Sequence, residues 1–354
     1  MTTELLVRPR TLRFRSMVLS AAGMRTGVEG FWLRLGDGLG EVTLLPGFGT
    51  EPPEKARAAL ADAASALRGT APPLSAEDVA NRIKKIPILH EAPATRAGVE
   101  LALLDSGARH AGVPLSTWLG SEPRSVRVNA LLIDDEVDAL VSEARARAHE
   151  NFDTLKIKVG VATAEHDAAR LNAVRAAVGP NVRIRVDGNA AWSEGEARTR
   201  LEAFAAARLE YVEQPVAAND FECLRRLRSL ARIAADESIG VPGAREGLFG
   251  GKRPAVDVLV FKLPVVGGVL RARRYAALAW EQGVEVVVTS AMDGAVSRAG
   301  AAHLASTLPL EGPAHGLATG HILESDEGGY AISHGLCHLP DLPGLGIDPQ
   351  VLGW

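Results

Sequence analysis

The sequence predicts an α/β protein in which a barrel of repeated strand–helix units follows a smaller α+β unit. From about Val126, short apolar runs alternate with Ala-, Arg- and Glu-rich amphipathic stretches, a pattern that indicates parallel strands joined by helices. About seven such units occur in a row, which favours a closed barrel over an open doubly wound sheet. The preceding part of the chain lacks this alternation, so we expect it to form a unit of its own.

The first third of the chain contains predicted strands and then predicted helices. Thr11–Val18 and Gly30–Leu35 are rich in apolar and β-branched residues, and a Gly-rich turn follows the second run, as is typical of strands. The Ala-rich stretch Glu54–Arg68 and the stretch Pro93–Ala111, with apolar residues at helical spacing, predict two helices.

The barrel strands are predicted from seven apolar runs, each followed by a polar or helical segment. They are Val128–Leu132, Leu155–Val159, Val182–Val186, Leu209–Val212, Arg232–Ala234, Asp257–Phe261 and Val284–Val288. Helices are predicted between them, for example over Glu194–Ala207 and Leu270–Gln282. From Pro313 onward the chain is rich in Gly, His and Pro, which predicts a last strand and a tail that packs back on the N-terminal unit.

The composition is that of a globular protein, with 47% apolar and 23% charged residues and a formal net charge of −4. This charge indicates neither a nucleic-acid partner nor binding to an anionic membrane surface. The densest basic run, Arg271, Arg273 and Arg274, is interpreted as one solvated helix face. Cys223 and Cys337 have no metal or redox spacing, and the N-terminus lacks the apolar stretch of a signal peptide, so we expect a cytoplasmic protein. The oligomeric state is left open.

Charged residues stand at the ends of five consecutive predicted strands, about one β/α unit apart. They are Lys156 and Lys158, then Asp187, Glu213, Asp236 and Lys262. Because barrel strands end at the same rim, these side chains are expected to meet there, and two lysines two residues apart on a strand point to the same face. Three acids of like charge need a cation to hold them together, and oxygen ligands without His or Cys suit Mg²⁺.

Each of these residues also has a structural interpretation. An isolated Asp or Glu after a strand is usually a loop residue or a helix N-cap, and a lysine at a strand end is usually solvated. The ordered set of acids and lysines at successive strand ends is difficult to explain by packing alone.

At these residues the sequence resembles the enolase superfamily, specifically its muconate-lactonizing subgroup. The matching barrel stretches are LKIKVG (155–160), RVDGNAAW (185–192), VEQP (212–215), AADES (234–238) and VFKLPVVGG (260–268). Two further stretches, 38–47 and 95–120, resemble the subgroup's capping domain. The resemblance implies a modified (β/α)7β TIM-type barrel with an α+β N-terminal capping domain. In that arrangement residues 1–122 form the cap, residues 123–315 form the barrel, and residues 316–354 return to the cap.

The resemblance also implies a role for each polar residue. The implied ligands of Mg²⁺, for which Mn²⁺ can substitute, are Asp187, Glu213 and Asp236. Lys158 and Lys262 are implied to be an acid/base pair on opposite faces of a small-molecule carboxylate substrate. Lys156 is implied to lie near the substrate carboxylate, and Asn189 to support the metal-site geometry. Lysines beside Mg²⁺ and beside each other are expected to have lowered pKa values, which would allow one of them to act as a base.

The late segments VTSAMDGAVSRAGAAHLAS (288–306) and HGLATG (315–320) most resemble o-succinylbenzoate synthases of menaquinone biosynthesis. These enzymes dehydrate 2-succinyl-6-hydroxy-2,4-cyclohexadiene-1-carboxylate. Ser290 and Met292 in the first segment are expected near the substrate. The loop Ala21–Gly27, with Arg25, is expected to close over the succinyl group.

Other members of the subgroup are alternatives. Dipeptide epimerases carry an Asp-x-Asp pair near the last barrel strand, and Ala314–Leu317 contains no carboxylate, which argues against that activity. N-acylamino acid racemase activity stays open, because it needs the same metal and the same two lysines, and muconate cycloisomerase is a further candidate from the subgroup. From a different class, a non-catalytic metal-binding barrel is a further alternative.

Overall fold

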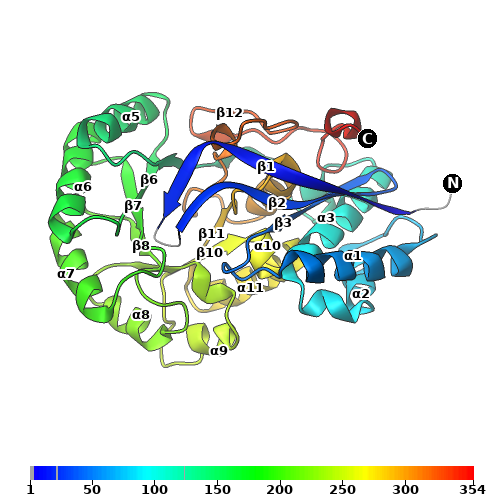
Figure 1. Ribbon diagram of the computed structural model, residues 1–354, viewed down its shortest axis with the longest axis horizontal. Coiled ribbons are helices and arrows are strands. Elements are labelled where there is room, and N and C mark those ends of the chain that lie inside the picture. The colour runs from blue at the N-terminus through cyan, green and yellow to red at the C-terminus, as the bar shows by residue number, and fades with distance from the viewer. Residues whose placement is uncertain (1–3, 21–22, 123) are drawn as a thin grey trace.

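The computed structural model describes residues 4–20, 23–122 and 124–354. Its N-terminal part is an antiparallel sheet in the order β1–β2–β3 with helices packed against it (Figure 1). The strands are β1 (Leu5–Ser20), β2 (Gly23–Leu35) and β3 (Gly38–Leu44), and the helical elements are α1 (Pro53–Leu67), α2 (Ala76–Lys84), η1 (Pro87–His90), α3 (Pro93–His110) and α4 (Leu115–Trp118). The predicted strands and helices of this region are confirmed within these bounds.

The sequence does not predict strand β3, because Gly38 and Gly40 at its start are typical of a turn. Added Cβ atoms on Gly38 and Gly40 would lie 2.2 Å from the carbonyl oxygens of Ala102 and Gly98 on α3. The two glycines are therefore needed for the close approach of this strand to the helix. The approach buries all of β3, and it fixes the sheet of the cap on α3.

The barrel is a parallel sheet in the order β5–β6–β7–β8–β9–β10–β11. The strands are β5 (Ala130–Leu132), β6 (Thr154–Lys158), β7 (Arg183–Asp187), β8 (Tyr211–Glu213), β9 (Ile233–Ala235), β10 (Val258–Lys262) and β11 (Glu285–Thr289). They confirm the seven predicted runs. The sheet curls, and its outer helices form the arc seen at the left of Figure 1.

Helices connect these strands as the spacing of the apolar residues predicts. They are α5 (Val137–His149), α6 (Ala164–Val178), α7 (Glu194–Phe204), η2 (Ala205–Ala207), α8 (Phe221–Leu227), η3 (Glu237–Ile239), α9 (Ala244–Phe249), α10 (Leu263–Val266), α11 (Val269–Glu281) and α12 (Ala295–Ser306). Helix α7 begins with a capping box between Ser193 and Glu196, which satisfies free backbone N–H groups at its start.

The eighth barrel position is a short extended segment, and the regular last strand predicted after Pro313 is absent from the described residues. Two isolated parallel bridges, Val128 with His315 and Thr289 with Gly316, close the sheet between β5 and β11. The fully buried Arg185 on β7 donates to the carbonyl oxygen of Ala314 at 2.7 Å. The closed barrel is thus confirmed, with its last segment held mainly by single bridges and one buried arginine.

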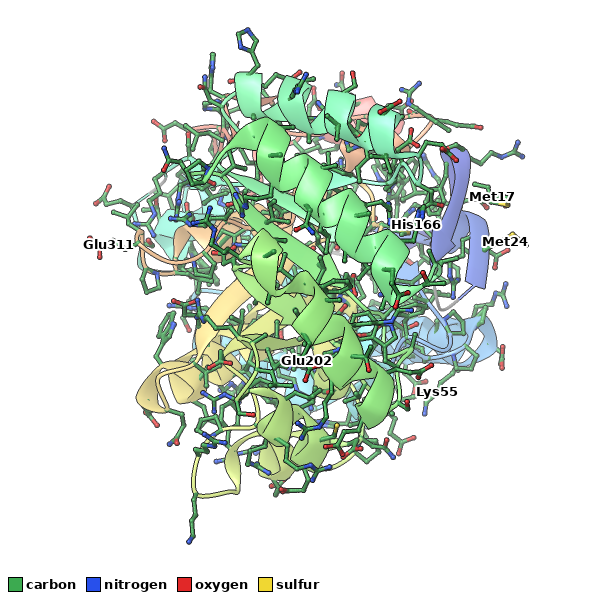
Figure 2. The ribbon with its side chains drawn as sticks, turned by 90° about the vertical axis from the view of Figure 1, so that its left-hand side faces the viewer. Met17, Met24, Lys55, His166, Glu202 and Glu311 are labelled. Atoms are coloured by element: carbon green, nitrogen blue, oxygen red, sulfur yellow. The ribbon has the colours of Figure 1, made fainter. Side chains whose placement is uncertain are left out.

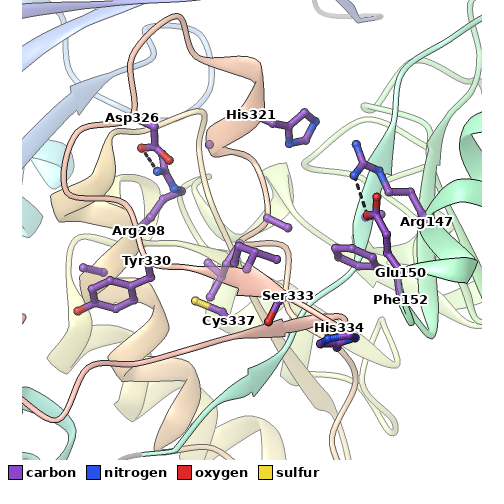
Figure 3. A pocket seen from close by; sticks show the side chains of 16 residues that line it. Arg147, Glu150, Phe152, Arg298, His321, Asp326, Tyr330, Ser333, His334 and Cys337 are labelled. Carbon is purple, nitrogen blue, oxygen red and sulfur yellow. Dashed lines mark hydrogen bonds and ion pairs between the residues drawn. The ribbon is translucent and has the colours of Figure 1, made fainter.

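The outside of this eighth segment is covered by the C-terminal chain, where a complete barrel would have an eighth helix. The elements of this C-terminal chain are η4 (Gly320–Ile322), β12 (Ile332–Ser333) and β13 (Leu336–Cys337), and β13 pairs with β4 (Val126–Arg127), which precedes the barrel. They leave a cavity of about 530 Å³ between α5, α12 and the chain that follows the barrel (Figure 3). Its charged side chains are already paired, Arg147 with Glu150 and Arg298 with Asp326.

The last residues, which include η5 (Pro349–Leu352), pack on the cap. Arg8 of β1 donates to the carbonyl oxygens of Leu352 and Gly353 at 3.0 Å each. The backbone N–H of Leu115 donates to the carbonyl oxygen of Gly344 at 2.8 Å. These contacts connect the end of the chain to its beginning.

Several surface and chemical features complete the fold. The thiols of Cys223 and Cys337 are free and buried. Met17 and Met24 of the β1–β2 hairpin lie at the outer edge of the molecule (Figure 2), with exposed fractions of 57% and 65%. None of the helices in the described part of the chain is long and apolar enough to cross a membrane.

A buried histidine joins three parts of the fold. His303 of α12 accepts a hydrogen bond from the backbone N–H of Ser116 in the cap at 3.1 Å through Nδ1. Its Nε2 lies 3.0 Å from the hydroxyl of Tyr330 in the C-terminal segment. Burial lowers the pKa of His303 to about 4, because the charged imidazolium is poorly solvated there.

We predict that His303 makes the protein sensitive to mild acid. The unfolded chain binds a proton near pH 6.5 and the folded chain does so only near pH 4, so stability is lost as pH falls through this window. Protonation of His303 is expected to lower the free energy of unfolding by roughly 3 kcal/mol across this pH window. Urea unfolding from pH 7 to pH 4.5 measures the slope, and His303→Gln is expected to reduce it. An unchanged slope in that variant would contradict the assignment.

Candidate active site at the barrel mouth

The carboxyl ends of strands β6 to β10 bring the predicted polar residues to one rim. In the sheet register, Lys158 lies beside Asp187 and Asp187 lies beside Glu213. Asp236 follows β9 directly, and Lys262 is the last residue of β10. The apolar parts of these strands are buried in the barrel wall, so each polar residue is placed where its strand leaves the core.

The acids and lysines form a connected set of ion pairs. Lys156 Nζ lies 2.6 Å from Glu213 Oε1 and 3.0 Å from Asp187 Oδ2. Lys158 Nζ lies 3.4 Å from Asp187 Oδ2, and Lys262 pairs with Asp236. The three acids are almost fully buried. The structure therefore brings together all six of the predicted acids and lysines.

Asn189 connects this set to a fourth acid. Its side-chain oxygen accepts from Lys158 Nζ at 2.8 Å, and its amide donates to Glu237 Oε1 at 3.4 Å. Sequence reasoning did not assign Glu237 to the site, although it directly follows Asp236. The adjacency of two acids after a strand was the available signal.

Gln214 fixes the turn that carries Asp236, and it was also missed as a site residue. Its side-chain oxygen accepts from the backbone N–H groups of Asp236 and Ser238 at 3.0 Å each. Its amide donates to the carbonyl oxygen of Val216 and to the hydroxyl of Ser238. Gln214 is fully buried, so its four polar contacts hold the Asp236 turn against β8.

The protein's own charges set opposite pKa shifts on the acids. Burial and the charges of Asp187 and Asp236 raise the pKa of Glu213 to about 7 against the opposing charge of Lys156. Burial and Asp236 raise the pKa of Glu237 to about 8. Burial favours a raised pKa for Asp187 as well, but the positive charges of Lys156 and Lys158 outweigh this effect and hold its pKa well below the usual range. The lysines thus compensate only part of the negative charge of Glu213 and Glu237, which lie at the ends of β8 and β9.

The lysine pKa values are raised by the same acids. Burial, the largest single effect, lowers the pKa of Lys262, but Asp236, Glu237 and Glu213 together raise it above its ordinary value. The pKa of Lys156 is raised for the same reason by Asp187 and Glu213. The lysine pKa values are therefore raised by the protein's own groups, whereas the sequence predicts lowered values beside Mg²⁺. The difference arises because the predicted lowering depends on the charge of the divalent ion, which the protein groups do not supply.

The donor set fits a hard divalent cation. Glu213 Oε2 and Glu237 Oε2 are buried and have no hydrogen-bond partner among the described residues, and such carboxylate oxygens are the ligands that Mg²⁺ prefers. Across the described ranges, no three Asp, Glu, His or Cys side chains are already gathered as a metal site. The reason is geometric: Asp187, Glu213 and Asp236 each point an oxygen at an ammonium group.

A cavity of about 90 Å³ lies above the lysines. Its lining includes Lys156, Lys158, Asp187, Asn189 and Lys262 from the rim, Arg25, Leu45 and Phe48 from the cap, and Ser290, Met292 and Thr319 from the last loops. The β1–β2 hairpin that carries Arg25 reaches from the cap toward the barrel (Figure 1). Residues 21 and 22 of the predicted closing loop lie outside the described residues.

The cap residues make specific contacts over this cavity. The guanidinium of Arg25 lies 5.4 Å from the ring centroid of Phe48, and Lys262 Nζ lies 5.9 Å from the same ring. The Ser290 hydroxyl lies 2.7 Å from the hydroxyl of Thr319. The predicted substrate-contacting residues Arg25, Ser290 and Met292 therefore reach the cavity that contains the lysines.

A buried carboxylate of the cap positions the loop that carries Ser290 and Met292. Glu41 of β3 accepts from the backbone N–H of Gly294 at 2.5 Å and of Ser297 at 3.0 Å, at the start of α12. It also pairs with the buried Arg10 of β1. A carboxylate at a helix N-terminus is stabilised by the free N–H groups there, so the cap and this loop are connected by a charged contact.

Comparison with known proteins agrees with this architecture. Residues 139–351 match the family model described as Enolase C-terminal domain-like. The chain is 35% identical to a hydrophobic dipeptide epimerase of Enterococcus faecalis over 61% of each chain. A solved dipeptide epimerase from the same strain, complexed with Mg and the dipeptide L-Leu-L-Tyr, superposes with a TM-score of 0.88 at 27% identity, covering 98% of this chain and all of the other.

Two further relatives have other activities. The chain is 38% identical to an o-succinylbenzoate synthase of Thermobifida fusca over 66% of this chain and 68% of the relative. It is 32% identical to muconate cycloisomerase 1-1 of Acinetobacter lwoffii over 88% of this chain and 83% of the relative. The fold and the rim define a capped β/α-barrel enzyme. The chain belongs to the enolase superfamily.

We predict that Glu41→Ala destabilises the fold by about 3–5 kcal/mol, since it leaves the buried Arg10 without its partner and removes two hydrogen bonds from α12. The free energy of unfolding in urea measures this loss. Asp37→Ala, at the exposed position directly before β3, is the matched control and is expected to change stability by less than about 0.5 kcal/mol. A Glu41 variant as stable as the control would contradict the positioning role.

Proposed function

We propose that this enzyme removes the proton next to a carboxylate of a small dicarboxylic acid. The reaction would use a divalent metal ion bound at the barrel mouth, which is Mg²⁺ or, as a substitute, Mn²⁺. Asp187, Glu213 and Asp236 would hold the metal, and Glu237 lies beside them. When bound, the metal would stabilise the negative charge that builds up on the substrate carboxylate during proton removal. Glu213 Oε2 and Glu237 Oε2, which have no hydrogen-bond partner in the described part of the chain, support this proposal, as does the Mg in the solved epimerase.

Lys158 and Lys262 are the proposed acid/base pair. They end β6 and β10, between which β7, β8 and β9 intervene in the sheet, so they approach the cavity from opposite sides. A carbon acid bound between them presents one face to each lysine Nζ, so the base is the lysine that is present as the neutral amine and the acid is the one that is protonated. A lysine base combined with Mg²⁺ is the established pattern of the enolase superfamily, and this assignment follows it. Lys156, paired with Glu213 and Asp187, is proposed to stabilise the developing charge.

The charge of the cavity lining favours a second anionic group on the substrate. Apart from Asp187, no carboxylate is among the described residues that line it, and Arg25 supplies a cation at the cap side. A dipeptide would present an ammonium group with only Asp187 as a carboxylate in the lining, and Asp187 is already paired with Lys156 and Lys158, so burial of that ammonium group costs free energy. A succinyl or N-succinyl carboxylate has Arg25 as a partner. This lining is the observation that favours a dicarboxylate over a dipeptide.

Among dicarboxylate reactions, we propose o-succinylbenzoate synthesis. The substrate would be 2-succinyl-6-hydroxy-2,4-cyclohexadiene-1-carboxylate. Lys158 Nζ would take the proton from C1, the C6–O bond would break, and that proton would leave with the hydroxyl as water while the ring becomes aromatic. Lys262 would stay protonated on the other face. The similarity to the Thermobifida synthase supports this reaction, and such a role places the enzyme in menaquinone biosynthesis in the cytoplasm.

Racemisation of an N-acylamino acid is the second candidate, because the presence of both Lys158 and Lys262 at the cavity favours it. Racemisation needs one base and one acid on opposite faces, whereas the dehydration needs a base on one face only. The two reactions therefore differ in their dependence on Lys262.

We predict fast, Mg²⁺-dependent turnover of the cyclohexadiene carboxylate, followed by the change in absorbance on aromatisation. Lys158→Ala is expected to lower kcat by at least about 10³-fold, as expected for loss of a general base together with its charge. Lys252→Ala, at a solvent-exposed lysine outside the rim, is the matched control and is expected to keep full activity.

The same preparations distinguish the alternatives. No turnover by a folded wild type that binds Mg²⁺, together with exchange of the α-proton of N-succinylamino acids in D₂O, would replace the synthase with the racemase. Stabilisation by Mg²⁺ without turnover or exchange of either substrate would indicate the non-catalytic barrel.

A further inference from the structure

A second large cavity lies between the cap and the barrel, away from the barrel mouth. Its volume is about 740 Å³, and it is formed by α2, η1 and α3 of the cap together with α9 and α11 of the barrel. We call it the basic cavity, after its basic lining residues Lys84, His90, Arg96, Arg245, Arg271 and Arg274. No Asp or Glu is among the described residues that line it.

Most of these cations have no counter-ion. Within the described ranges, the ion pairs of the protein include none for Lys84, Arg245, Arg271 or Arg274, and no side-chain hydrogen bond is formed by these four residues either. Arg96 is the exception, since its Nη2 lies 3.2 Å from Glu100 Oε2. The lining therefore carries four cations on three separate helices that form no close ion pair among the described residues, and Glu100 acts on Arg274 only at longer range.

The guanidinium groups of Arg96 and Arg271 converge on one point of the backbone. An added Cβ on Gly267 would lie 3.6 Å from Arg96 Nη1 and 3.5 Å from Arg271 Nη1. Arg96 is buried and also donates to the carbonyl oxygen of Gly267. After burial and the pairing with Glu100, the charges of Arg271 and Arg274 are the next largest influences on the lowered pKa of Arg96. Like charges thus face each other across a concave surface, where their fields add.

This arrangement corrects the interpretation of the run Arg271–Arg274 as one solvated helix face. Arg271 and Arg274 are exposed, but they join Lys84 and Arg245 from other elements around a cavity. Arg273, between them in sequence, is half-buried and does not line it. The contribution of α2 and α9 depends on the tertiary fold, so the run on α11 alone could not show it.

We propose that the basic cavity binds a small molecule that carries a condensed phosphate group, a diphosphate or a triphosphate. Guanidinium groups bind phosphate oxygens in bidentate pairs, and several converging arginines suit several adjacent phosphates. A volume of about 740 Å³ lies in the range of small-molecule sites. The proposal is independent of the chemistry at the barrel mouth.

The occupant has to contact both domains. Lys84 and Arg96 belong to the cap, whereas Arg245, Arg271 and Arg274 belong to the barrel. A bound polyphosphate therefore stabilises the docked arrangement of the two domains, because it binds only when the five cations are together. A nucleic acid is a poorer match, since the cations line one concave site on a protein of net charge −4 and form no stripe along its surface.

The test is titration calorimetry of the full-length protein with sodium pyrophosphate and tripolyphosphate. The buffer is free of divalent metal and of EDTA, because a tetracarboxylate would compete, and NaCl keeps the ionic strength constant. We expect one saturable site, with inorganic phosphate binding at least tenfold more weakly. The double variant Arg271→Ala with Arg274→Ala is expected to weaken pyrophosphate binding at least tenfold.

The matched control is Arg145→Ala, an exposed arginine on α5 that lies outside the basic cavity and is expected to bind as the wild type does. ADP and ATP test whether a nucleoside adds affinity to the same site, and a single-stranded oligonucleotide tests the nucleic-acid alternative. Absence of saturable binding, equal binding by the double variant and the control, or tighter binding of the oligonucleotide than of ATP would each overturn the proposal.

Discussion

The three carboxylates of the barrel mouth impose the main constraint on this structure, because they repel each other in a place where water cannot screen them. Adjacent strands in register place Asp187 beside Glu213, and the Gln214 side chain holds the Asp236 turn against the same edge. Three lysines compensate part of this charge from both sides. The backbone register and the buried Gln214 side chain thus keep the three acids together despite their mutual repulsion.

The cap is an integral part of the site. Glu41 stabilises the start of α12 and thereby the loop with Ser290 and Met292, while Arg25 and Phe48 cover the lysines. His303 joins the same helix to Ser116 of the cap and to Tyr330 of the C-terminal segment. Residues of the cap and of the last barrel loops therefore share the lining of the cavity that contains the lysines.

The sequence predicted the barrel strands and the rim residues well, because both follow from local patterns: apolar runs define the strands, and charged residues interrupt them at one end. It missed β3, whose glycines are needed for contact with α3, and it missed Gln214 and Glu237, whose roles depend on partners from neighbouring strands. The eighth barrel segment was predicted as a strand but consists of single bridges, since Arg185 and neighbouring strands hold it in place of a ladder. Tertiary contacts of this kind leave no periodic signal.

The most direct measurement is calorimetric titration of the purified enzyme with Mg²⁺, repeated with Glu213→Gln, Asp236→Asn and the exposed-site control Asp341→Asn. A divalent cation held by the buried acids should bind at one site per chain in the wild type and in the control. Loss of one ligand charge should weaken that binding at least about tenfold in the two rim variants. Equal Mg²⁺ binding by all four proteins, or no binding by the wild type, would contradict a metal site at the barrel mouth.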